Sequence, residues 1–287
     1  MVASAPEPAI ASKVPGAMHK IAIYGKGGIG KSVVATHLSA ELARRGMRVL
    51  HVGCDPKADS SCRLTGRHVV RTVLAQISRD PDELDVSELI TPGRNGIDCI
   101  EAGGPEPGAG CGGRGVARAV ELIGELQLLD SGRYDAAVFD VLGDVVCGGF
   151  AAPLRKGFAR KVLIVVSEES MALFAANNIA RAVIANASNG VVLAGLVANL
   201  RSADATRRAR VDDFARALGT RVVATLERSA LISDAELELK TAVEMAPESD
   251  VARTFRALAD DVLALDPEAL ASPTPLEQEA FFDFMRR

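Results

Sequence analysis

A glycine-rich segment that ends in lysine and serine carries the strongest chemical signal in this 287-residue chain. Gly25–Ser32 reads GKGGIGKS and matches the phosphate-binding pattern G-x-x-x-x-G-K-S/T. An apolar run precedes it and an amphipathic stretch follows it, which is the strand–loop–helix context that this motif requires. The N–H groups of such a loop surround phosphate oxygens, and the helix N-terminus adds a favourable dipole. A chance glycine-rich turn is the alternative, and the flanking elements argue against it.

The positions of this loop have distinct expected roles in nucleotide binding. Lys31 is expected to reach the β- and γ-phosphates, and the Ser32 hydroxyl is expected to bind Mg²⁺. The other nucleotide-binding positions are Gly25, Lys26, Gly27, Gly28, Ile29 and Gly30. An ordinary loop of this type does not need Lys26, and here the segment resembles the deviant P-loop ATPases. In that class, this lysine reaches the nucleotide of the other subunit and acts as an arginine finger does.

A first acidic segment follows the apolar run before Cys54, in the sequence CDPKADS. Asp55 and Asp59 flank Lys57, and all three are candidates for contact with the nucleotide. One carboxylate could orient the attacking water while the other holds Mg²⁺ through water. Because Asp and Pro are common in turns, a solvated acidic turn remains the alternative.

A second acidic segment begins where the apolar run before Asp140 ends. An apolar strand ending in aspartate is similar to a Walker B motif, whose carboxylate lies near Mg²⁺. Asp144 follows four positions later, and Gly143 between them gives the backbone freedom to move when the γ-phosphate leaves. Both aspartates are therefore candidates for catalysis and for sensing the nucleotide.

Two of the five cysteines, at positions 54, 62, 99, 111 and 147, stand in glycine-rich segments. Cys111 lies in GGPEPGAGCGGRG and Cys147 in DVVCGGF. Flanking N–H groups can point at the sulfurs of an inorganic cluster, and two thiolates are half of what a cubane cluster needs. A two-fold dimer would supply the other two. On spacing alone, a pair of buried structural thiols explains the two residues equally well.

Short apolar runs and amphipathic stretches alternate along the chain and position these loops. The expected strands are Lys20–Tyr24, Arg48–Gly53, Ile97–Glu101, Tyr134–Asp140, Lys161–Ser167, Val191–Asn199 and Arg221–Leu226. The expected helices are Lys31–Arg45, Val69–Ile77, Val116–Leu129, Met171–Ala187, Ala203–Leu218 and Val251–Leu265. The pattern predicts an α/β fold with a single doubly wound, mostly parallel sheet, the P-loop NTPase fold of the deviant Walker A type. Ligands of such sheets bind at the carboxyl ends of the strands.

Composition and charge exclude several functional classes. The net charge of −4 predicts neither a nucleic-acid-binding nor a membrane-binding surface. No apolar run is long enough to span a bilayer, and residues 1–17 lack the apolar core of a signal peptide, so a cytoplasmic location is expected. We expect a disordered extension over residues 1–17, the P-loop domain over residues 18–265, and a C-terminal arm over residues 266–287 that packs across the body or onto a partner subunit.

Several long segments resemble one known family. They are GKGGIGKS, CDPKADS, EAGGPEPGAGCGGRG, DVLGDVVCGGF, ALFAANNIARA, VEMAPESDVARTFRALA and PTPLE. Together they resemble the nitrogenase iron protein (dinitrogenase reductase) family and its nitrogenase-like relatives, from about Met18 almost to the C-terminus. The resemblance implies an ATP-hydrolysing oxidoreductase component. This component would be a homodimer that passes low-potential electrons from one shared 4Fe–4S cluster to a catalytic partner with MgATP hydrolysis. A ferredoxin or flavodoxin would supply the electrons.

The resemblance also implies roles for particular residues. Cys111 and Cys147 would ligate the cluster, with Asp55 and Asp59 in a first switch loop and Asp140 and Asp144 in a second that leads directly to Cys147. The other implied sites are Arg114, an arginine that some members ADP-ribosylate, Phe150 and Arg155, near the cluster face and partner docking, and Asn199 and Arg228, on the adenine side.

The chain departs from the family pattern at a few positions. Glu227-Arg228-Ser229 stands where Pro-Arg-Asp is usual, the cluster segment reads CGGRG in place of CAGRG, and Cys62 is unmatched. CGGRG and the opening IAIYGKGGIGKS also resemble chlorophyllide reductase iron subunits, whereas the C-terminal part resembles nitrogenase reductase. These features favour a nitrogenase-like system over nitrogen fixation. Methylthio-alkane reductase, which reduces small organic sulfur compounds, ranks first, with chlorophyllide reductase and true dinitrogenase reductase as alternatives.

Two other classes of protein share part of the pattern. A partitioning or positioning P-loop ATPase needs no cysteines in its loops and would have a basic face or a basic C-terminal helix. Leu276–Arg287 is acidic and apolar until its last two residues. An iron–sulfur scaffold ATPase usually carries a CxxC pair, and this chain has none.

Overall fold

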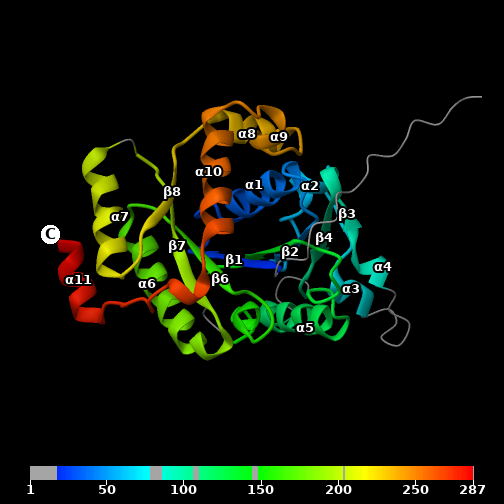
Figure 1. Ribbon diagram of the computed structural model, residues 1–287, viewed down its shortest axis with the longest axis horizontal. Helices are drawn as coiled ribbons and strands as arrows, with labels where there is room; N and C mark the ends of the chain where they lie inside the picture. Colours follow the sequence, from blue (N-terminus) through cyan, green and yellow to red (C-terminus); the bar gives the residue numbers. More distant parts are fainter. Residues whose placement is uncertain (1–17, 78–85, 106–109, 144–147, 203, 287) are drawn as a thin grey trace, which may run out of the picture.

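A computed structural model describes residues 18–77, 86–105, 110–143, 148–202 and 204–286 of the chain. Residues 1–17, for which a disordered extension is expected, lie outside this part. An eight-stranded sheet forms the centre of the molecule (Figure 1). Its strands are β1 (His19–Gly25), β2 (Val49–Cys54), β3 (Thr91–Pro92), β4 (Ile97–Glu101), β5 (Ala136–Val141), β6 (Lys161–Val166), β7 (Val192–Asn199) and β8 (Val222–Leu226).

The strand order explains where ligands can bind. The sheet runs β3-β4-β2-β5-β1-β6-β7-β8, and every pairing is parallel except that of β3 with β4. The chain winds outward from β1 in both directions, so the crevice at the carboxyl ends of β1 and its neighbours is the topological switch point. The prediction of a doubly wound, mostly parallel α/β sheet is confirmed.

Helices cover both faces of the sheet (Figure 1). The α-helices are α1 (Lys31–Arg44), α2 (Cys62–Thr65), α3 (Val73–Ile77), α4 (Val86–Leu89), α5 (Gly112–Glu125), α6 (Ser170–Ala185), α7 (Ala205–Ala217), α8 (Ala230–Leu237), α9 (Ala242–Met245), α10 (Asp250–Ala264) and α11 (Gln278–Arg286). Single 3₁₀ turns are η1 (Arg94–Gly96), η2 (Ala152–Leu154), η3 (Ala187–Asn189) and η4 (Pro267–Ala269). No helix of the described residues is long and apolar enough to cross a membrane.

Alternation along β1 shows how the two layers form. Ile21 and Ile23 pack in the core beneath α1 and α10, whereas Ala22 and Tyr24 pack in the core that includes α5, α6 and α7. Successive side chains of a strand point to opposite faces, so a strand that is apolar throughout is buried on both sides. All four residues have no exposed surface.

The predicted strands all exist within one or two residues of their expected bounds, but two predicted helices differ. The helix predicted over Val69–Ile77 begins only at Val73, because Thr72 instead forms a parallel bridge to Glu101. Helix α5 begins at Gly112, four residues before the expected start, so the glycine-rich segment after Cys111 is already helical.

The C-terminal segment lies against its own subunit along α6 and α7. The Leu276 N–H donates to Asn177 Oδ1 at 2.8 Å, and the Thr274 N–H donates to the Leu218 carbonyl at 2.8 Å. Phe281 of α11 is 1% exposed, with its ring centroid 5.3 Å from that of Phe174. Phe281 of the segment LEQEAFFDFM therefore belongs to the core of this chain, whereas Phe282 is 46% exposed.

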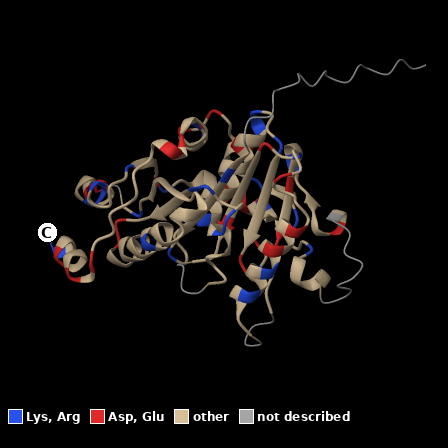
Figure 2. Cartoon of the chain, turned by 60° about the horizontal axis from the view of Figure 1, so that its bottom comes forward, with Lys and Arg blue, Asp and Glu red and all other residues tan. Residues whose placement is uncertain are grey.

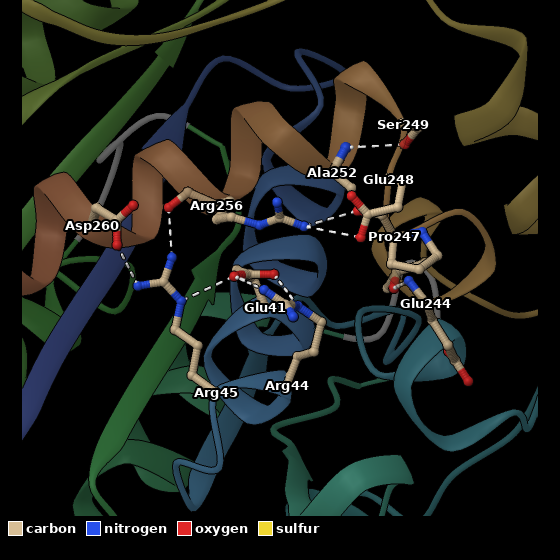
Figure 3. A network of polar contacts seen from close by, with 11 residues as sticks. Glu41, Arg44, Arg45, Glu244, Pro247, Glu248, Ser249, Ala252, Arg256 and Asp260 are labelled. Atoms are coloured by element: carbon tan, nitrogen blue, oxygen red, sulfur yellow. Dashed lines mark hydrogen bonds and ion pairs between the residues drawn. The ribbon is translucent and has the colours of Figure 1, made fainter.

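A buried carboxylate ties α1, the helix that follows the phosphate loop, to α10 (Figure 3). Glu41 has no exposed side-chain surface and accepts hydrogen bonds from Arg44 and Arg45 at 2.8–2.9 Å. Arg45 also pairs with Asp260 Oδ1 at 2.6 Å and donates to the Arg256 carbonyl at 2.7 Å. Removing one partner of such a pair leaves a charge without its counter-ion.

Replacing Glu41 with glutamine is expected to lower the free energy of unfolding by about 2 kcal/mol, since the arginines are partly exposed and water compensates in part. Urea unfolding followed by circular dichroism measures the change. The matched control is Glu268→Gln, which breaks an exposed pair with Arg160 and should leave the unfolding curve in place. Equal stability of Glu41→Gln and the wild type would show that the network does not stabilise the α1–α10 contact.

Candidate nucleotide site and cysteine loops

A cavity of about 750 Å³ opens at the carboxyl ends of β1, β2 and β5. It combines the glycine-rich loop with both acidic segments. Asp55 and Asp140, the first aspartates of these segments, lie far from the loop in the sequence. The predicted residues that line it are Gly27, Gly28, Gly30, Lys31, Ser32, Asp55, Lys57, Asp59 and Asp140. The described fold therefore brings together most of the residues predicted to hold a nucleotide.

Close packing explains two glycines of the phosphate loop. Gly25 has φ +148°, and a Cβ atom there would lie 2.4 Å from the Val165 carbonyl oxygen. Gly30 has φ +99°, and a Cβ atom there would lie 2.4 Å from Asn199 Nδ2. Helix α1 begins at the next residue, Lys31, so the first free N–H groups of the helix open onto the cavity.

The two lysines of the loop differ in their surroundings. Lys31 is 7% exposed, and its ammonium donates to the Lys26 carbonyl at 3.1 Å. The Lys26 side chain is half-buried, and its ammonium makes no hydrogen bond or ion pair to another described residue. Lys31 is thus held inside the cavity, while Lys26 is available to a group outside this subunit.

Asp140, at the end of the cavity's central strand β5, is 3% exposed. Its Oδ2 accepts a hydrogen bond from the Ser60 hydroxyl at 2.5 Å, and the Ser32 hydroxyl lies close enough to lower the pKa of Asp140. Burial raises the pKa of Asp140, while the two hydroxyls and the nearby Lys31 charge oppose that shift. A carboxylate beside the loop serine is the arrangement that a Walker B aspartate needs to help hold Mg²⁺.

The first acidic segment forms a tight turn around its own lysine. Asp55 Oδ1 accepts the Lys57 N–H at 2.9 Å, and Lys57 Nζ lies 3.6 Å from a carboxylate oxygen of both Asp55 and Asp59. These two charges raise the pKa of Lys57. The lysine lines the cavity mouth and balances the two carboxylates.

The adenine-side residues lie in a neighbouring cavity of about 370 Å³. Asn199 donates to the Ile29 carbonyl at 2.8 Å, which fixes the end of β7 against the phosphate loop. Arg228 lines the same cavity between Glu227 and Ser229. This cavity lies where the adenine base of a nucleotide bound at the phosphate loop is expected. Direct contact of Asn199 or Arg228 with adenine stays a prediction.

Cys111 is exposed and occupies the N-cap position of α5. Its predicted partner Cys147, and Asp144, lie outside the described residues. The described residues that follow Cys111 and Cys147 nevertheless meet. A Cβ atom on Gly149 would lie 2.1 Å from the Gly113 carbonyl oxygen. These two glycines each lie two positions after a predicted ligand, so the backbone brings the two cysteine segments into contact.

The resemblance places Arg114, Phe150 and Arg155 near a partner or a modifying enzyme, and these three residues differ in exposure. Arg114, in the first turn of α5, is exposed, and its modification stays a prediction. Arg155 is exposed and pairs with Glu121 at 2.9 Å. Phe150 is only 9% exposed, and its carbonyl accepts the Tyr24 hydroxyl at 2.9 Å, so its ring packs in the core. A role of Phe150 near the cluster face or in partner docking stays a prediction.

Glu101, at the end of β4, is a buried acid that sequence reasoning missed. It is 1% exposed, and its Oε1 accepts the Ser61 N–H at 2.6 Å. Its Oε2 is buried without a hydrogen-bond partner among the described residues. Burial raises its pKa to about 8, against hydrogen bonds from Ser61 and with help from the charges of Asp140 and Asp59.

Glutamine at this position is expected to stabilise the fold in alkaline solution. The folded pKa of Glu101 is raised above its ordinary value of 4.5, so its neutral form supports folding fully below pH 4.5 and this support is lost as the pH rises toward 8. Glu101→Gln should therefore gain on the order of 2–4 kcal/mol over the wild type at pH 8 and nothing at pH 4.5. Urea unfolding at the two pH values measures this, with exposed Glu268→Gln as the control. A gain that does not change with pH would mean that Glu101 is ionised in the fold.

The fold is shared with ATPases of the MinD and ParA type. MinD complexed with Mg-ADP from Pyrococcus horikoshii superposes with a TM-score of 0.67 at 22% identity, over 85% of this chain and 96% of that chain. A ParA family ATPase from Chlorobium tepidum superposes with a TM-score of 0.66 at 19% identity, over 88% of this chain and all of that one. At this identity the likeness establishes the class, a P-loop NTPase fold, and nothing narrower.

The sequence comparisons establish the family. Residues 19–287 match the 4Fe-4S iron sulfur cluster binding proteins of the NifH/frxC family, and the chain belongs to that family. Nitrogenase iron protein 2 of Methanothermobacter thermautotrophicus is 44% identical over 270 residues, which cover 94% of this chain and 98% of the relative. The nitrogenase iron protein of Methanospirillum hungatei is 41% identical over 265 residues, which cover 91% and 93%. The predicted cofactors, a 4Fe–4S cluster and MgATP, are those of this family, which confirms that prediction.

The alternative of a partitioning or positioning ATPase finds support in the fold alone. Basic and acidic residues are interspersed over the described elements (Figure 2). Helix α11 ends in Arg286 but carries Glu279 in its first turn and packs Phe281 into the core. Both the family match and these features favour the iron protein.

Proposed function

We propose that this chain is the ATP-dependent electron-transfer component of a nitrogenase-like complex. A homodimer would hold one 4Fe–4S cluster between its subunits and pass low-potential electrons to a catalytic partner as it hydrolyses MgATP. A ferredoxin or flavodoxin would reduce the cluster. Membership of the NifH/frxC family supports the role of an electron-transfer component. The geometry of the described residues supports the coupling of the nucleotide site to a cluster ligand.

One contact carries the proposed coupling. Pro56 lies in the first acidic segment, directly after Asp55, and packs on the cysteine loop. A Cβ atom on Gly104 would lie 2.3 Å from Pro56 Cβ, and one on Gly112 would lie 2.6 Å from Pro56 Cγ. A loop that lines the nucleotide cavity on one side therefore touches, on the other, the residue next to Cys111. Movement of this loop on loss of the γ-phosphate would be transmitted to a cluster ligand, as switch loops transmit in other NTPases.

The nucleotide chemistry is assigned to the residues of the cavity. The N–H groups of the loop and Lys31 would bind the phosphates, while Ser32 and Asp140 would hold Mg²⁺. Asp55 or Asp59 would orient the attacking water. Lys26 would enter the partner subunit's site, where its charge would stabilise the transition state of phosphoryl transfer. Asp144 would extend the second switch toward Cys147.

The cysteine loops fit the cluster that the family implies. Cys111 is an exposed thiol at the start of a 14-residue helix, where an inorganic cluster can reach it. Glycines around it would let N–H groups approach the sulfurs of a bound cluster, and such groups adjust its potential. When bound, the cluster would supply one-electron transfer at low potential.

Among nitrogenase-like systems we place methylthio-alkane reductase first. CGGRG at the cluster and Glu227-Arg228-Ser229 at the adenine side depart from true nitrogenase reductases, while the C-terminal segment resembles them. The alternatives are a chlorophyllide reductase subunit and a true dinitrogenase reductase. The names of the relatives at 41–44% identity favour the dinitrogenase reductase.

Anaerobic purification tests the proposal. One 4Fe–4S cluster per dimer, an electron paramagnetic resonance signal after reduction, and MgATP hydrolysis are expected together. A protein that hydrolyses ATP but contains no iron after anaerobic purification and cluster reconstitution would be a positioning ATPase. Isolation of the catalytic partner by an affinity tag, followed by assays with dinitrogen, chlorophyllide and methylthio-alkanes, identifies the system.

A further inference from the structure

A chain of hydrogen bonds runs through the core beneath the nucleotide cavity and ends on Asp140. The Ser39 hydroxyl of α1 lies 2.9 Å from Nδ1 of His51 on β2. His51 Nε2 lies 2.9 Å from the Ser60 hydroxyl, which lies 2.5 Å from Asp140 Oδ2. All four residues are at most 3% exposed. Three separate elements and the first acidic segment are therefore joined through one imidazole.

Proton counting fixes the direction of this chain. The Ser60 hydroxyl has one proton, and it donates that proton to the Asp140 carboxylate. His51 must then donate its Nε2–H to the Ser60 oxygen, and its unprotonated Nδ1 accepts the Ser39 hydroxyl. Burial lowers the pKa of His51 to about 3, so the ring is neutral and carries one proton, as this pattern requires.

A second buried histidine, His37 of α1, shows what a purely structural role looks like. His37 Nδ1 donates to the Val33 carbonyl at 2.8 Å, and its Nε2 accepts the Ala242 N–H at 2.9 Å. Its ring stacks on Phe255 with centroids 4.8 Å apart. Its two closest partners are backbone atoms outside the acidic segments, and the proton sits on the opposite nitrogen from that of His51.

We propose that His51 is a positioning residue of the nucleotide site. It holds the Ser60 hydroxyl against Asp140 and so fixes the end of the first acidic segment to the start of the second. With this link, the two segments that flank the γ-phosphate position respond together. The inference rests on the proposed ATPase function and adds a residue to it that does not touch the nucleotide.

Three variants separate this role from packing. His51→Leu removes the donor to Ser60 and is expected to lower kcat for MgATP hydrolysis by about tenfold to a hundredfold, with less than about a threefold change in MgADP affinity. His51→Gln keeps an N–H donor near the Nε2 position and should recover kcat to within about threefold of wild type. His37→Gln is the matched control, because it lowers the melting temperature but leaves kcat unchanged.

A spectroscopic measurement covers the case in which His51→Leu does not fold. The chain has four histidines, and ¹⁵N labelling of histidine in the wild-type protein resolves their ring nitrogens. His51 should appear as the Nε2–H tautomer and His37 as the Nδ1–H tautomer. Replacing MgADP by MgADP with beryllium fluoride, which mimics the γ-phosphate, should shift the His51 signals and leave those of His37 in place.

Each failure has its own signature. The positioning role is overturned if the wild type is active and His51→Leu has the same kcat. It is also overturned if the His51 signals of the wild type do not shift with the γ-phosphate mimic. A wild-type protein that binds no MgATP and hydrolyses none overturns the proposed function itself.

Discussion

Replacing Cys111 with serine is expected to remove the iron–sulfur cluster from the dimer. Each dimer would lose two of its four proposed ligands, and a neutral hydroxyl replaces a thiolate that binds iron strongly. Iron analysis and the electron paramagnetic resonance signal of the anaerobically purified protein measure the loss. Because Cys111 is exposed at the start of α5, the substitution removes no core packing, and the apo-protein should remain folded.

Cys62→Ser is the matched control for this experiment. Cys62 is partly exposed and lines the nucleotide cavity rather than the cysteine loop. It should retain its full iron content. A Cys111→Ser dimer that keeps its iron would mean that the cluster is held elsewhere or that the thiol has another purpose.

The second large effect is expected at the two lysines of the phosphate loop. Lys31→Gln removes the charge inside the cavity and should lower kcat for MgATP hydrolysis by about 10²–10³. Lys26→Gln should lower it by about 10³ if its ammonium acts as a finger in the partner's site. Half-burial of Lys26 without a hydrogen-bond or ion-pair partner among the described residues is the observation behind this expectation.

Mixing the two variants shows whether Lys26 acts across the interface. In a mixed dimer, the site on the Lys26→Gln subunit has its own Lys31 and receives Lys26 from its partner. Random pairing of the two variants should therefore restore roughly a quarter of wild-type hydrolysis per subunit. If Lys26 acts within its own subunit, no site in any dimer is intact, and the mixture stays as inactive as either variant alone.

Sequence patterns were sufficient for the sheet and the phosphate loop because both are local. Strands such as β5 and β6 are apolar at nearly every position, and this pattern is readable in a window of six residues. The two-residue strand β3 and the four-residue helices α2 and α9 are too short to show a period. The start of α3 was misplaced because Thr72 is drawn into a bridge with Glu101, a tertiary contact that outweighs local propensity.

The relations within the site were beyond sequence reasoning because they join distant residues. Ser60 and Asp140 are 80 positions apart, and nothing in either segment indicates that a hydroxyl donates to that carboxylate. The Pro56 contact with Gly104 and Gly112 is likewise a product of the fold. Glu101 follows an apolar run as an ordinary strand-ending acid would, and only burial distinguishes it. The sequence therefore indicated which residues to consider, and only the fold shows which of them line one cavity and how they are connected.

The rate at which a chelator removes iron tests most directly the claim that the nucleotide state acts on the cluster ligands. The anaerobic dimer is mixed with bathophenanthroline disulfonate, and the rate is compared without nucleotide, with MgADP and with MgATP. The family resemblance predicts faster removal with MgATP than with MgADP, and the Pro56–Gly112 contact predicts that this difference is smaller in Pro56→Ala. Identical rates in all three conditions, in a protein shown to bind both nucleotides and one cluster, would contradict the coupling.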